Sequence, residues 1–153
     1  FNTKVQSKED IQKVTNIPFI GGIGHNSDSD NLIVYRKPKS AIAESFRALR
    51  SNLNYFTEGK DKKVFMITSS LSGEGKSFTT INLATVFAMA GKKTIIIGAD
   101  LRKPKLFDDF GLTNEKGLSG YLSGLVLLKE IIQRTNIEHL DVISGGPVPP
   151  NPS

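Results

Sequence analysis

The stretch TSSLSGEGKSFTT (residues 68–80) places a lysine between a glycine and a serine, directly after the apolar run KKVFMI. The spacing follows the phosphate-loop motif G-x-x-x-x-G-K-[ST], except that Ser70 stands where the first glycine belongs. The apolar residues 62–70 before the loop predict a buried parallel strand. Residues 78–91 after it predict a helix that ends near Gly91. A strand, a glycine-rich loop and a helix in this order are the context that the motif requires.

The chemistry of the loop agrees with phosphate binding. Gly73 and Gly75 allow backbone N–H groups to approach phosphate oxygens closely, and Lys76 supplies a positive charge. The hydroxyl of Ser77 is the kind of group that reaches a bound Mg²⁺, at a helix start whose dipole favours anions. We interpret the stretch as a nucleotide site rather than as a bare strand-to-helix turn.

The remaining pattern predicts an α/β protein. Residues 92–100 and 139–146 predict two further strands, and residues 16–24 a brief one. Helices are expected over residues 7–15, with a capping box of Ser7 and Asp10, and over residues 40–56, 118–124 and 126–135. Residues 25–38 suggest a polar loop around a short extended piece. Together they predict a doubly wound, mostly parallel sheet with helices on both faces, incomplete at its C-terminal end, in which an apolar edge is left to be covered.

We expect two parts, an N-terminal segment over residues 1–38 with a short helix and strand, and a phosphate-loop domain over residues 39–153. Because the chain starts with Phe1 and stops in a proline-rich loop, we expect it to be a piece of a longer protein.

Composition narrows the classes of function. The 153 residues carry a net charge of +5 and no cysteine, which excludes a disulfide framework and a thiolate metal site. Apolar runs long enough for a transmembrane helix are absent from the sequence. The excess charge is compatible with polyphosphate, nucleic acid or an anionic membrane surface, but spread-out lysines are more often simply solvated.

Asp100 ends the predicted strand over residues 92–100. Ligands of parallel α/β sheets bind at the carboxyl ends of strands, where a carboxylate is placed to hold Mg²⁺ directly or through water. The alternative is an aspartate that caps the following turn.

The helix over residues 40–56 carries an apolar stripe and, off that stripe, three charges. The stripe consists of Ile42, Phe46, Leu49, Leu53 and Phe56. Glu44, Arg47 and Arg50 stand three apart on what we expect to be an outer face. From the residues alone, a solvated face with weak ion pairs is the preferred interpretation.

Five blocks in a fixed order then carry a family resemblance: AESFRALRSNL, TSSLSGEGKSFTTINLA, GADLRKP, KGLSGYLSG and GPVPPNPS. Together they resemble the cytoplasmic ATPase domain of bacterial tyrosine kinases that serve capsule and exopolysaccharide synthesis. The resemblance covers nearly the whole chain from about Ser7 onward. It implies a P-loop fold similar to partition-type ATPases, with ATP or ADP and Mg²⁺ as ligands.

The resemblance also implies roles for individual residues. Lys76, Asp100 and Arg102 would be catalytic, and Ser77 and Asp100 would hold Mg²⁺. The nucleotide would lie against Ser72, Gly73, Glu74, Gly75, Lys76, Ser77 and Phe78. Glu44, Arg47 and Arg50 match an E-x-x-R-x-x-R motif through which the family's domains assemble into rings, each presenting a tyrosine cluster to its neighbour. Full-length relatives are anchored in the bacterial inner membrane on its cytoplasmic side, and no nucleic acid is implied.

Two departures from the family pattern matter. Gly98 stands where the family has the first aspartate of D-x-D, a candidate proton acceptor, and loss of a general base commonly costs about 10²–10⁴-fold in rate. The second Walker strand and the tyrosine cluster of the family would follow Ser153.

Three functions therefore stay open at this point. The first is a tyrosine kinase that phosphorylates neighbouring copies. The second is a nucleotide-binding adaptor on the same scaffold that assembles without phosphorylating. The third is a partition-type switch ATPase, which Leu71 disfavours because that class carries a second lysine at this position.

Overall fold

The computed structural model describes residues 5, 7–57, 62–102 and 106–149. A three-stranded sheet of order β1-β3-β2 holds one side of the molecule, formed by β1 (Thr94–Ile97), β2 (Ile132–Arg134) and β3 (Leu140–Ile143). The register of β1 and β3 is parallel, from Thr94 opposite Leu140 to Ile97 opposite Ile143. β2 pairs with β3 in the antiparallel sense. The sheet is therefore mixed, with one parallel pair.

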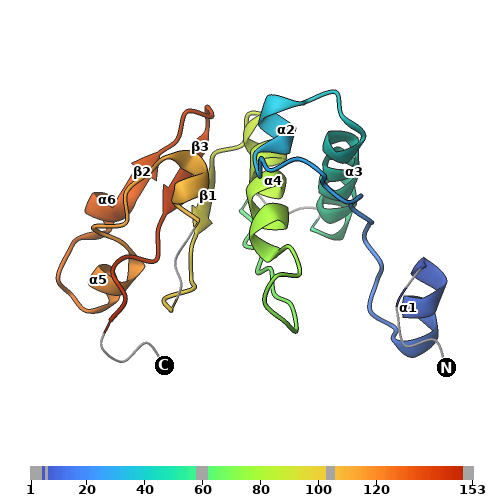
Figure 1. Ribbon diagram of the computed structural model, residues 1–153, viewed down its shortest axis with the longest axis horizontal. Coiled ribbons are helices and arrows are strands. Elements are labelled where there is room, and N and C mark those ends of the chain that lie inside the picture. Colours follow the sequence, from blue (N-terminus) through green and yellow to red (C-terminus); the bar gives the residue numbers. More distant parts are fainter. Residues whose placement is uncertain (1–4, 6, 58–61, 103–105, 150–153) are drawn as a thin grey trace.

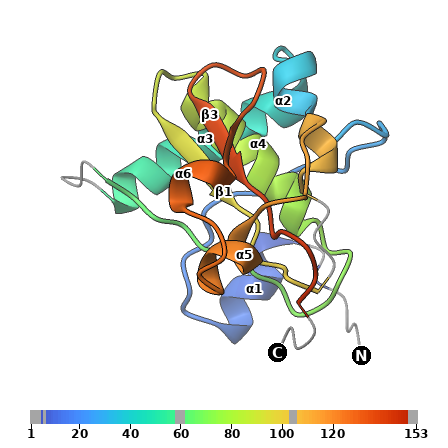
Figure 2. The same ribbon diagram turned by 90° about the vertical axis from the view of Figure 1, so that its left-hand side faces the viewer.

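Helices lie on both sides of this sheet, as the sequence predicts. The helix α4 (Lys76–Ala88) packs on one face, followed outward by α2 (Ile33–Arg36) and α3 (Ala41–Phe56), with α1 (Lys8–Val14) at the far end (Figure 1). The short helices α5 (Leu118–Leu122) and α6 (Leu128–Ile131) lie on the opposite side, in front of the sheet in Figure 2. A single 3-10 turn, η1 (Asp108–Phe110), follows β1.

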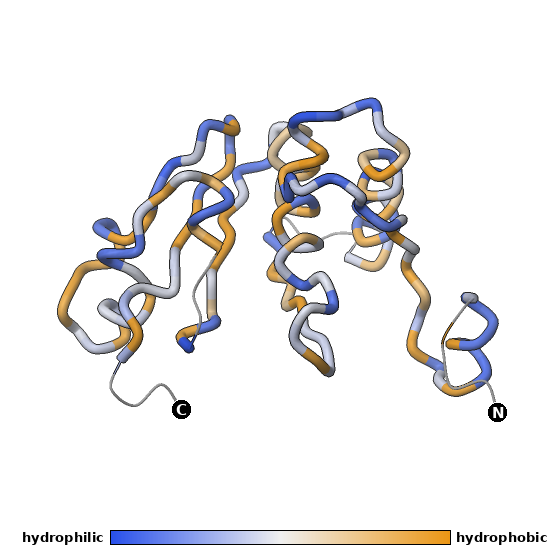
Figure 3. The backbone as a smooth tube through the Cα atoms, viewed as in Figure 1, coloured by the Kyte–Doolittle hydropathy of each residue, from blue (hydrophilic) through white to orange (hydrophobic). Residues whose placement is uncertain are grey.

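The central element is α4, which is buried on nearly every side after its first turn. Its Ile81, Ala84 and Ala88 belong to a core cluster with β1 and β3, while Leu83 and Val86 belong to a second cluster with α2 and α3. The hydropathy of the tube in Figure 3 follows this arrangement, with apolar residues concentrated along α4 and a mostly hydrophilic α1. α4 thus forms a wall shared by two cores.

Two helix ends form as the sequence predicts, and a third has a cap that was not predicted, Ser40. Ser7 and Asp10 make the reciprocal capping box of α1. Ser40 caps α3, where its hydroxyl accepts from the amide of Ala43 at 3.2 Å. Gly91, beyond the end of α4, takes a positive φ of 76° and lets the chain turn back toward β1.

Four secondary-structure predictions are wrong, three of them in the part of the chain that precedes the phosphate loop and one near its C-terminal end. Residues 16–24 form no strand, because their apolar side chains pack on α3 instead: Ile20 and Ile23 join the second core cluster. The extended piece expected near residue 33 is the helix α2, whose Ile33 and Val34 are buried against α4. The strand expected before the phosphate loop is likewise not formed.

That segment, residues 62–70, pairs with no strand among the described residues, and its side chains alternate outward. Val64 is 97% exposed and Met66 88% exposed, whereas Ile67 packs against the second core cluster. Ile95 and Ile97 of β1 are also exposed, so β1 is buried on one face only. The apolar edge that the sequence predicts is therefore present, at the exposed side of β1 and along residues 64–66.

The helix expected over residues 126–135 is shorter than predicted and turns into a strand. α6 ends at Ile131, and the next three residues pair with β3 as β2. The Gln133 side chain fixes this change of direction, since it donates to the carbonyl of Thr113 at 2.9 Å. Tertiary pairing here outweighs helix propensity.

Candidate nucleotide-binding site

The phosphate loop leads into α4, which begins at Lys76 itself. Gly75 is the N-cap residue with φ of 89°, and Gly73 has φ of 87°. A Cβ atom on either glycine would meet nothing within 4 Å, so the requirement for glycine comes from the left-handed backbone and not from crowding. The space beside both residues is open.

Lys76 folds back over its own loop. Its Nζ donates to Ser69 Oγ at 2.7 Å and to the carbonyl of Leu71 at 3.0 Å. Ser69 Oγ in turn donates to that same carbonyl at 2.8 Å. Both partners of the ammonium are neutral oxygens, so its positive charge stays available in the loop for an anion. A phosphate oxygen would be a stronger partner than either of them.

Glu74 closes the loop on itself. Its Oε2 accepts from the amide of Leu71 at 3.0 Å. The pKa of Glu74 lies below its ordinary value, mainly because of this backbone hydrogen bond and then because of the Ser69 hydroxyl, with a smaller contribution from the charge of Lys76. The carboxylate therefore shapes the loop, and what Glu74 offers to a nucleotide is its backbone.

Ser77 and Phe78 occupy the first turn of α4 with different surroundings. Ser77 is exposed, so its hydroxyl is accessible to a ligand at the loop. The ring of Phe78 packs edge-on against Phe46 of α3, with ring centroids 5.8 Å apart. Only the backbone of Phe78 is therefore left for nucleotide binding, the role that the resemblance implies. Its ring packs α4 against α3.

Asp100 and Arg102 lie just beyond β1 and are both exposed. Asp100 Oδ1 accepts from the amide of Arg102 at 3.0 Å, which is the turn-capping geometry of an aspartate. This contact occupies one carboxylate oxygen with the chain's own backbone.

Gly98 continues the ladder of β1, since its amide donates to the carbonyl of Ile143 at 2.8 Å. A Cβ atom at this position would lie 3.4 Å from Gly145 N and 3.4 Å from the Ile143 carbonyl oxygen, which is ordinary contact. The backbone at position 98 therefore accommodates a Cβ atom, with Leu106 Cδ2 as the next neighbour at 3.7 Å.

The three charges of α3 separate into a pair and a single residue. Glu44 and Arg47 form a two-point ion pair, with Nη2–Oε1 at 2.7 Å and Nε–Oε2 at 3.2 Å. This pair lowers the pKa of Glu44 and raises that of Arg47. Arg50 instead turns inward and donates to the backbone carbonyl of Val86 in α4 at 2.8 Å. The expectation of an outer face is thus wrong for Arg50.

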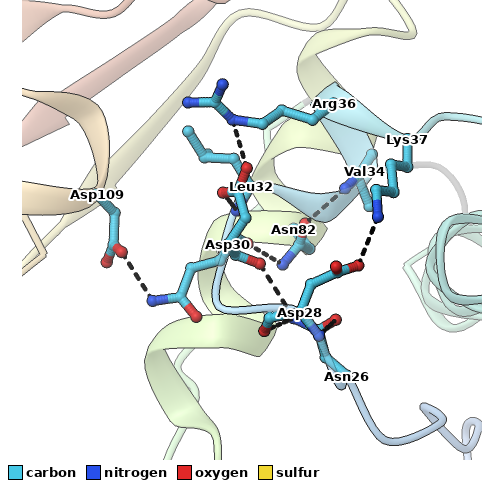
Figure 4. Close-up of polar contacts among 10 residues, drawn as sticks. Asn26, Asp28, Asp30, Leu32, Val34, Arg36, Lys37, Asn82 and Asp109 are labelled. Carbon is cyan, nitrogen blue, oxygen red and sulfur yellow. Dashed lines mark hydrogen bonds and ion pairs between the residues drawn. The ribbon is translucent and has the colours of Figure 1, made fainter.

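Asn82 is a residue that sequence reasoning missed. It is fully buried in α4, where its Oδ1 accepts from Val34 N at 3.0 Å and its Nδ2 donates to Asn31 O at 2.7 Å. Asn31 in turn donates to Asp109 Oδ1 at 2.7 Å. Figure 4 shows Asn82 bonded to Val34. The signal in the sequence is a polar residue between Ile81 and Leu83, inside an otherwise apolar helix.

Salt bridges hold the segment before α2 on the same side. Lys37 pairs with Asp28 at 2.9 Å, and Arg36 pairs with Asp30 (Figure 4). Asp30 also accepts from the amide of Leu32 at 2.8 Å. These acidic side chains are engaged in shaping the loop that leads into α2.

Two surface grooves of about 580 and 390 Å³ lie at the amino-terminal ends of β1 and β3. Neither groove is lined by a residue of the phosphate loop. The candidate nucleotide site is therefore identified by the residues of the loop and not by the shape of the surface. Within the described part of the chain, no group of three or more His, Cys, Asp or Glu side chains is placed to hold a metal ion. None of the helices described there is long and apolar enough to cross a membrane.

Residues 65–143 match the family model of the CobQ/CobB/MinD/ParA nucleotide binding domain. This span is more than half of the chain and includes the phosphate loop, α4 and the whole sheet, so the chain belongs to this family of P-loop nucleotide-binding proteins. The predicted α/β P-loop fold is thereby confirmed.

Within that family, the chain is similar to bacterial tyrosine kinases, as the sequence blocks predict. Tyrosine-protein kinase YwqD of Bacillus subtilis is 44% identical over 123 residues, covering 80% of this chain and 52% of that protein. The crystal structure of the chimerical protein CapA2B2 has a TM-score of 0.85 at 41% identity, covering 95% of this chain and 63% of that one. The kinase domain of Escherichia coli tyrosine kinase ETK has a TM-score of 0.76 at 35% identity, covering 84% of this chain and 51% of that one.

The chain spans about half the length of the curated relative YwqD. What that protein does as a whole is therefore a basis for proposals about this chain.

Proposed function

We propose that this chain is the nucleotide-binding part of a bacterial protein-tyrosine kinase, which transfers the γ-phosphoryl group of ATP to tyrosines on neighbouring copies of itself. The observation that carries the proposal is the loop before α4, where two left-handed glycines and Lys76 form a phosphate cradle at a helix start. The relatives named tyrosine-protein kinases support the choice of reaction. Capsule or exopolysaccharide synthesis is the process that the resemblance suggests.

The residues present fit Mg-ATP. Lys76 and the backbone amides from Ser72 to Phe78 would bind the phosphates, and Lys76 would exchange its neutral oxygen partners for a phosphate oxygen. Ser77 and Asp100 would hold Mg²⁺, and Arg102 would add positive charge beside the phosphates. When bound, Mg²⁺ neutralises the charge that develops on the phosphate oxygens. The chain's own contribution is to position the phosphates, which is most of what phosphoryl transfer requires.

For assembly, the relevant surface is the exposed side of α3. The Glu44–Arg47 pair lies at the surface, and we propose that it contacts a neighbouring copy in a ring, so that each copy presents tyrosines to the next. In the full-length protein we place this domain on the cytoplasmic side of the inner membrane, next to a membrane anchor, with no nucleic acid as partner. The division into residues 1–38 and 39–153 stays a prediction, and the burial of Ile33 and Val34 shows that the first part contributes to the core.

Gly98 favours a second candidate, a nucleotide-binding adaptor that assembles without phosphorylating. A glycine offers no carboxylate to accept the tyrosine proton at this place. Because the backbone at position 98 accommodates a Cβ atom, the two candidates can be separated by one substitution.

The deciding experiment measures phosphotyrosine formation with Mg-ATP by the full-length natural chain and by its Gly98→Asp variant. Lys76→Met in each background is the control, since it removes the phosphate-binding charge. If the natural chain is active and loses activity with Lys76→Met, it is a kinase whose proton acceptor lies elsewhere. If only Gly98→Asp is active, the natural chain is the adaptor. Activity that survives Lys76→Met in both backgrounds contradicts the proposed site.

A further inference from the structure

The charged motif of α3 divides into an outward pair and an inward arm. The side chains of Glu44 and Arg47 are 68% and 31% exposed and bond to each other. Arg50 is partly buried, and its guanidinium crosses to α4, where Nη1 donates to the carbonyl of Val86 at 2.8 Å. The family resemblance gives the three residues one role, whereas their contacts give them two.

The acceptor of Arg50 is a carbonyl that α4 itself leaves unused. In a continuing helix the amide of Ala90 would donate to Val86, but it donates to Phe87 at 3.1 Å instead. Val86 is thus among the last carbonyls of α4, at the negative end of the helix dipole. A guanidinium there satisfies the carbonyl and interacts favourably with the dipole.

A second contact ties the other end of α4 to the same helix. Phe46 of α3 packs against Phe78, which lies in the first turn of α4 beside Lys76 and Ser77. α3 therefore holds α4 near its start through an aromatic contact and near its end through Arg50. Because α4 is packed on nearly all sides, a change at one end is expected to tilt the whole helix, and with it the phosphate loop.

We propose that Arg50 is a positioning residue that couples the assembly face of α3 to the phosphate loop at the start of α4. This inference rests on the proposed function, in which Glu44 and Arg47 meet a neighbouring copy. A neighbour that holds α3 then holds α4 in its nucleotide-binding position, and bound nucleotide favours the neighbour by the same factor, since coupling between two binding events is reciprocal.

The test measures the Kd of a fluorescent ADP with Mg²⁺ for the full-length natural chain, diluted until sedimentation velocity shows monomers. Arg50→Met removes the donor, and Arg50→Lys keeps a positive donor. Arg134→Met, at an exposed arginine of β2, is the matched control. We expect Arg50→Met to raise the Kd about 3- to 10-fold, which lies within the range found for residues that modulate coupling. Arg50→Lys should recover part of the loss, and Arg134→Met should leave the Kd unchanged.

A second readout separates coupling from simple destabilisation. A merely destabilised protein would show fewer binding sites per chain at an unchanged Kd, whereas a misplaced loop keeps the number of sites and weakens each. At concentrations that allow assembly, Arg47→Met should reduce the assembled fraction more than the nucleotide affinity. Arg50→Met should do the reverse.

An unchanged Kd in Arg50→Met, or a loss of sites without a change in Kd, overturns the coupling. If Arg50→Met acts only on assembly, as Arg47→Met does, the coupling is also refuted and the motif has one role. Failure of the proposed function is distinguishable, because then the unsubstituted chain itself binds no Mg-nucleotide or forms no phosphotyrosine in its Gly98 and Gly98→Asp forms.

Discussion

At the scale of single residues, the buried amide of Asn82 has the most demanding environment. It bonds to Val34, Asn31 and Phe78, so its carbonyl oxygen and its NH₂ group are all satisfied inside α4. The bonds to Val34 and Asn31 fix α2 and the segment before it against α4. A buried amide with complete pairing specifies one register between two elements.

We expect Asn82→Leu to lower the free energy of unfolding by about 3 kcal/mol. The substitution leaves the Val34 amide and the Asn31 carbonyl without partners, and an unsatisfied buried group costs about 1–3 kcal/mol. Urea unfolding followed by circular dichroism measures the effect. Asn52→Leu, at an exposed position with one bond to Ile20, should cost under about 1 kcal/mol. Equal losses in the two variants would contradict the structural role of Asn82.

The carboxylate of Glu130 gives the protein a predictable dependence on pH. Its oxygens accept from the amide of Leu127 at 2.8 Å and from Lys116 Nζ at 2.8 Å. The backbone bond first, and then Lys116, hold the pKa of Glu130 below its ordinary value of 4.5. Since the folded-state pKa is depressed, the stabilisation is present above the unfolded value and is lost as pH falls through the folded one.

Glu130→Gln should therefore lower the Tm slightly at pH 7 and make no difference well below pH 4.5. Thermal unfolding of both proteins across this range checks the sign. Because Glu130 is at the surface, the effect should also shrink with added salt. A difference in Tm that grows toward low pH would show that the carboxylate is not stabilising in the folded state.

At the scale of elements, the sequence predicts those helices whose formation depends on the spacing of nearby residues. The helix α3 is correct because its apolar residues repeat at helical spacing. The end of α4 is correct because Gly91 marks it, although α4 begins at Lys76, two residues before the predicted start. What fails depends on partners far along the chain. Residues 62–70 have strand composition, but composition does not supply a neighbouring strand, and none pairs with them among the described residues.

The candidate site divides in the same manner. The sequence alone identifies the loop glycines, Lys76 and Ser77, because their roles are read from a contiguous motif. It does not show that the Phe78 ring is a core residue, since that depends on Phe46 of another helix. Nor does it show that Arg50 faces inward, because a spacing of three places a residue on a helix without fixing what lies opposite.

The packing of α3 on α4 predicts a large effect of Phe46. This side chain is fully buried in the second core cluster and contacts the ring of Phe78. We expect Phe46→Ala to lower the free energy of unfolding by about 3–5 kcal/mol, the usual cost of removing a buried aromatic side chain. Urea titration measures it, with Tyr55→Ala at an exposed position of the same helix as control. A cost of under about 1 kcal/mol would mean that α3 is not packed as described.

At the scale of the whole molecule, the exposed apolar edge is the feature most open to solvent. Val64, Met66, Ile95 and Ile97 all have side chains in water, and β1 is an edge strand. Edges of this kind pair readily with other chains. The 153-residue chain is therefore expected to self-associate.

We expect the double substitution Val64→Thr and Met66→Thr to reduce this self-association, because it removes apolar area while keeping residues that tolerate extended backbone. Light scattering of the 153-residue chain against concentration measures it. Val14→Thr, at an exposed position of α1, is the control and should change little. Association that persists unchanged in the double variant would place the contact elsewhere on the surface.

The position of α4 between two cores has a consequence for how the protein comes together. Leu32 and Val142, which are far apart in the sequence, both belong to the cluster on one face of α4, and α3 closes the other face. Neither core is complete without this helix, so the backbone amides of α4 should be the last to exchange with deuterated water. Cutting the chain before α4 would leave both pieces with an open apolar surface. Both hydrophobic cores therefore depend on α4, the helix that begins at the phosphate loop.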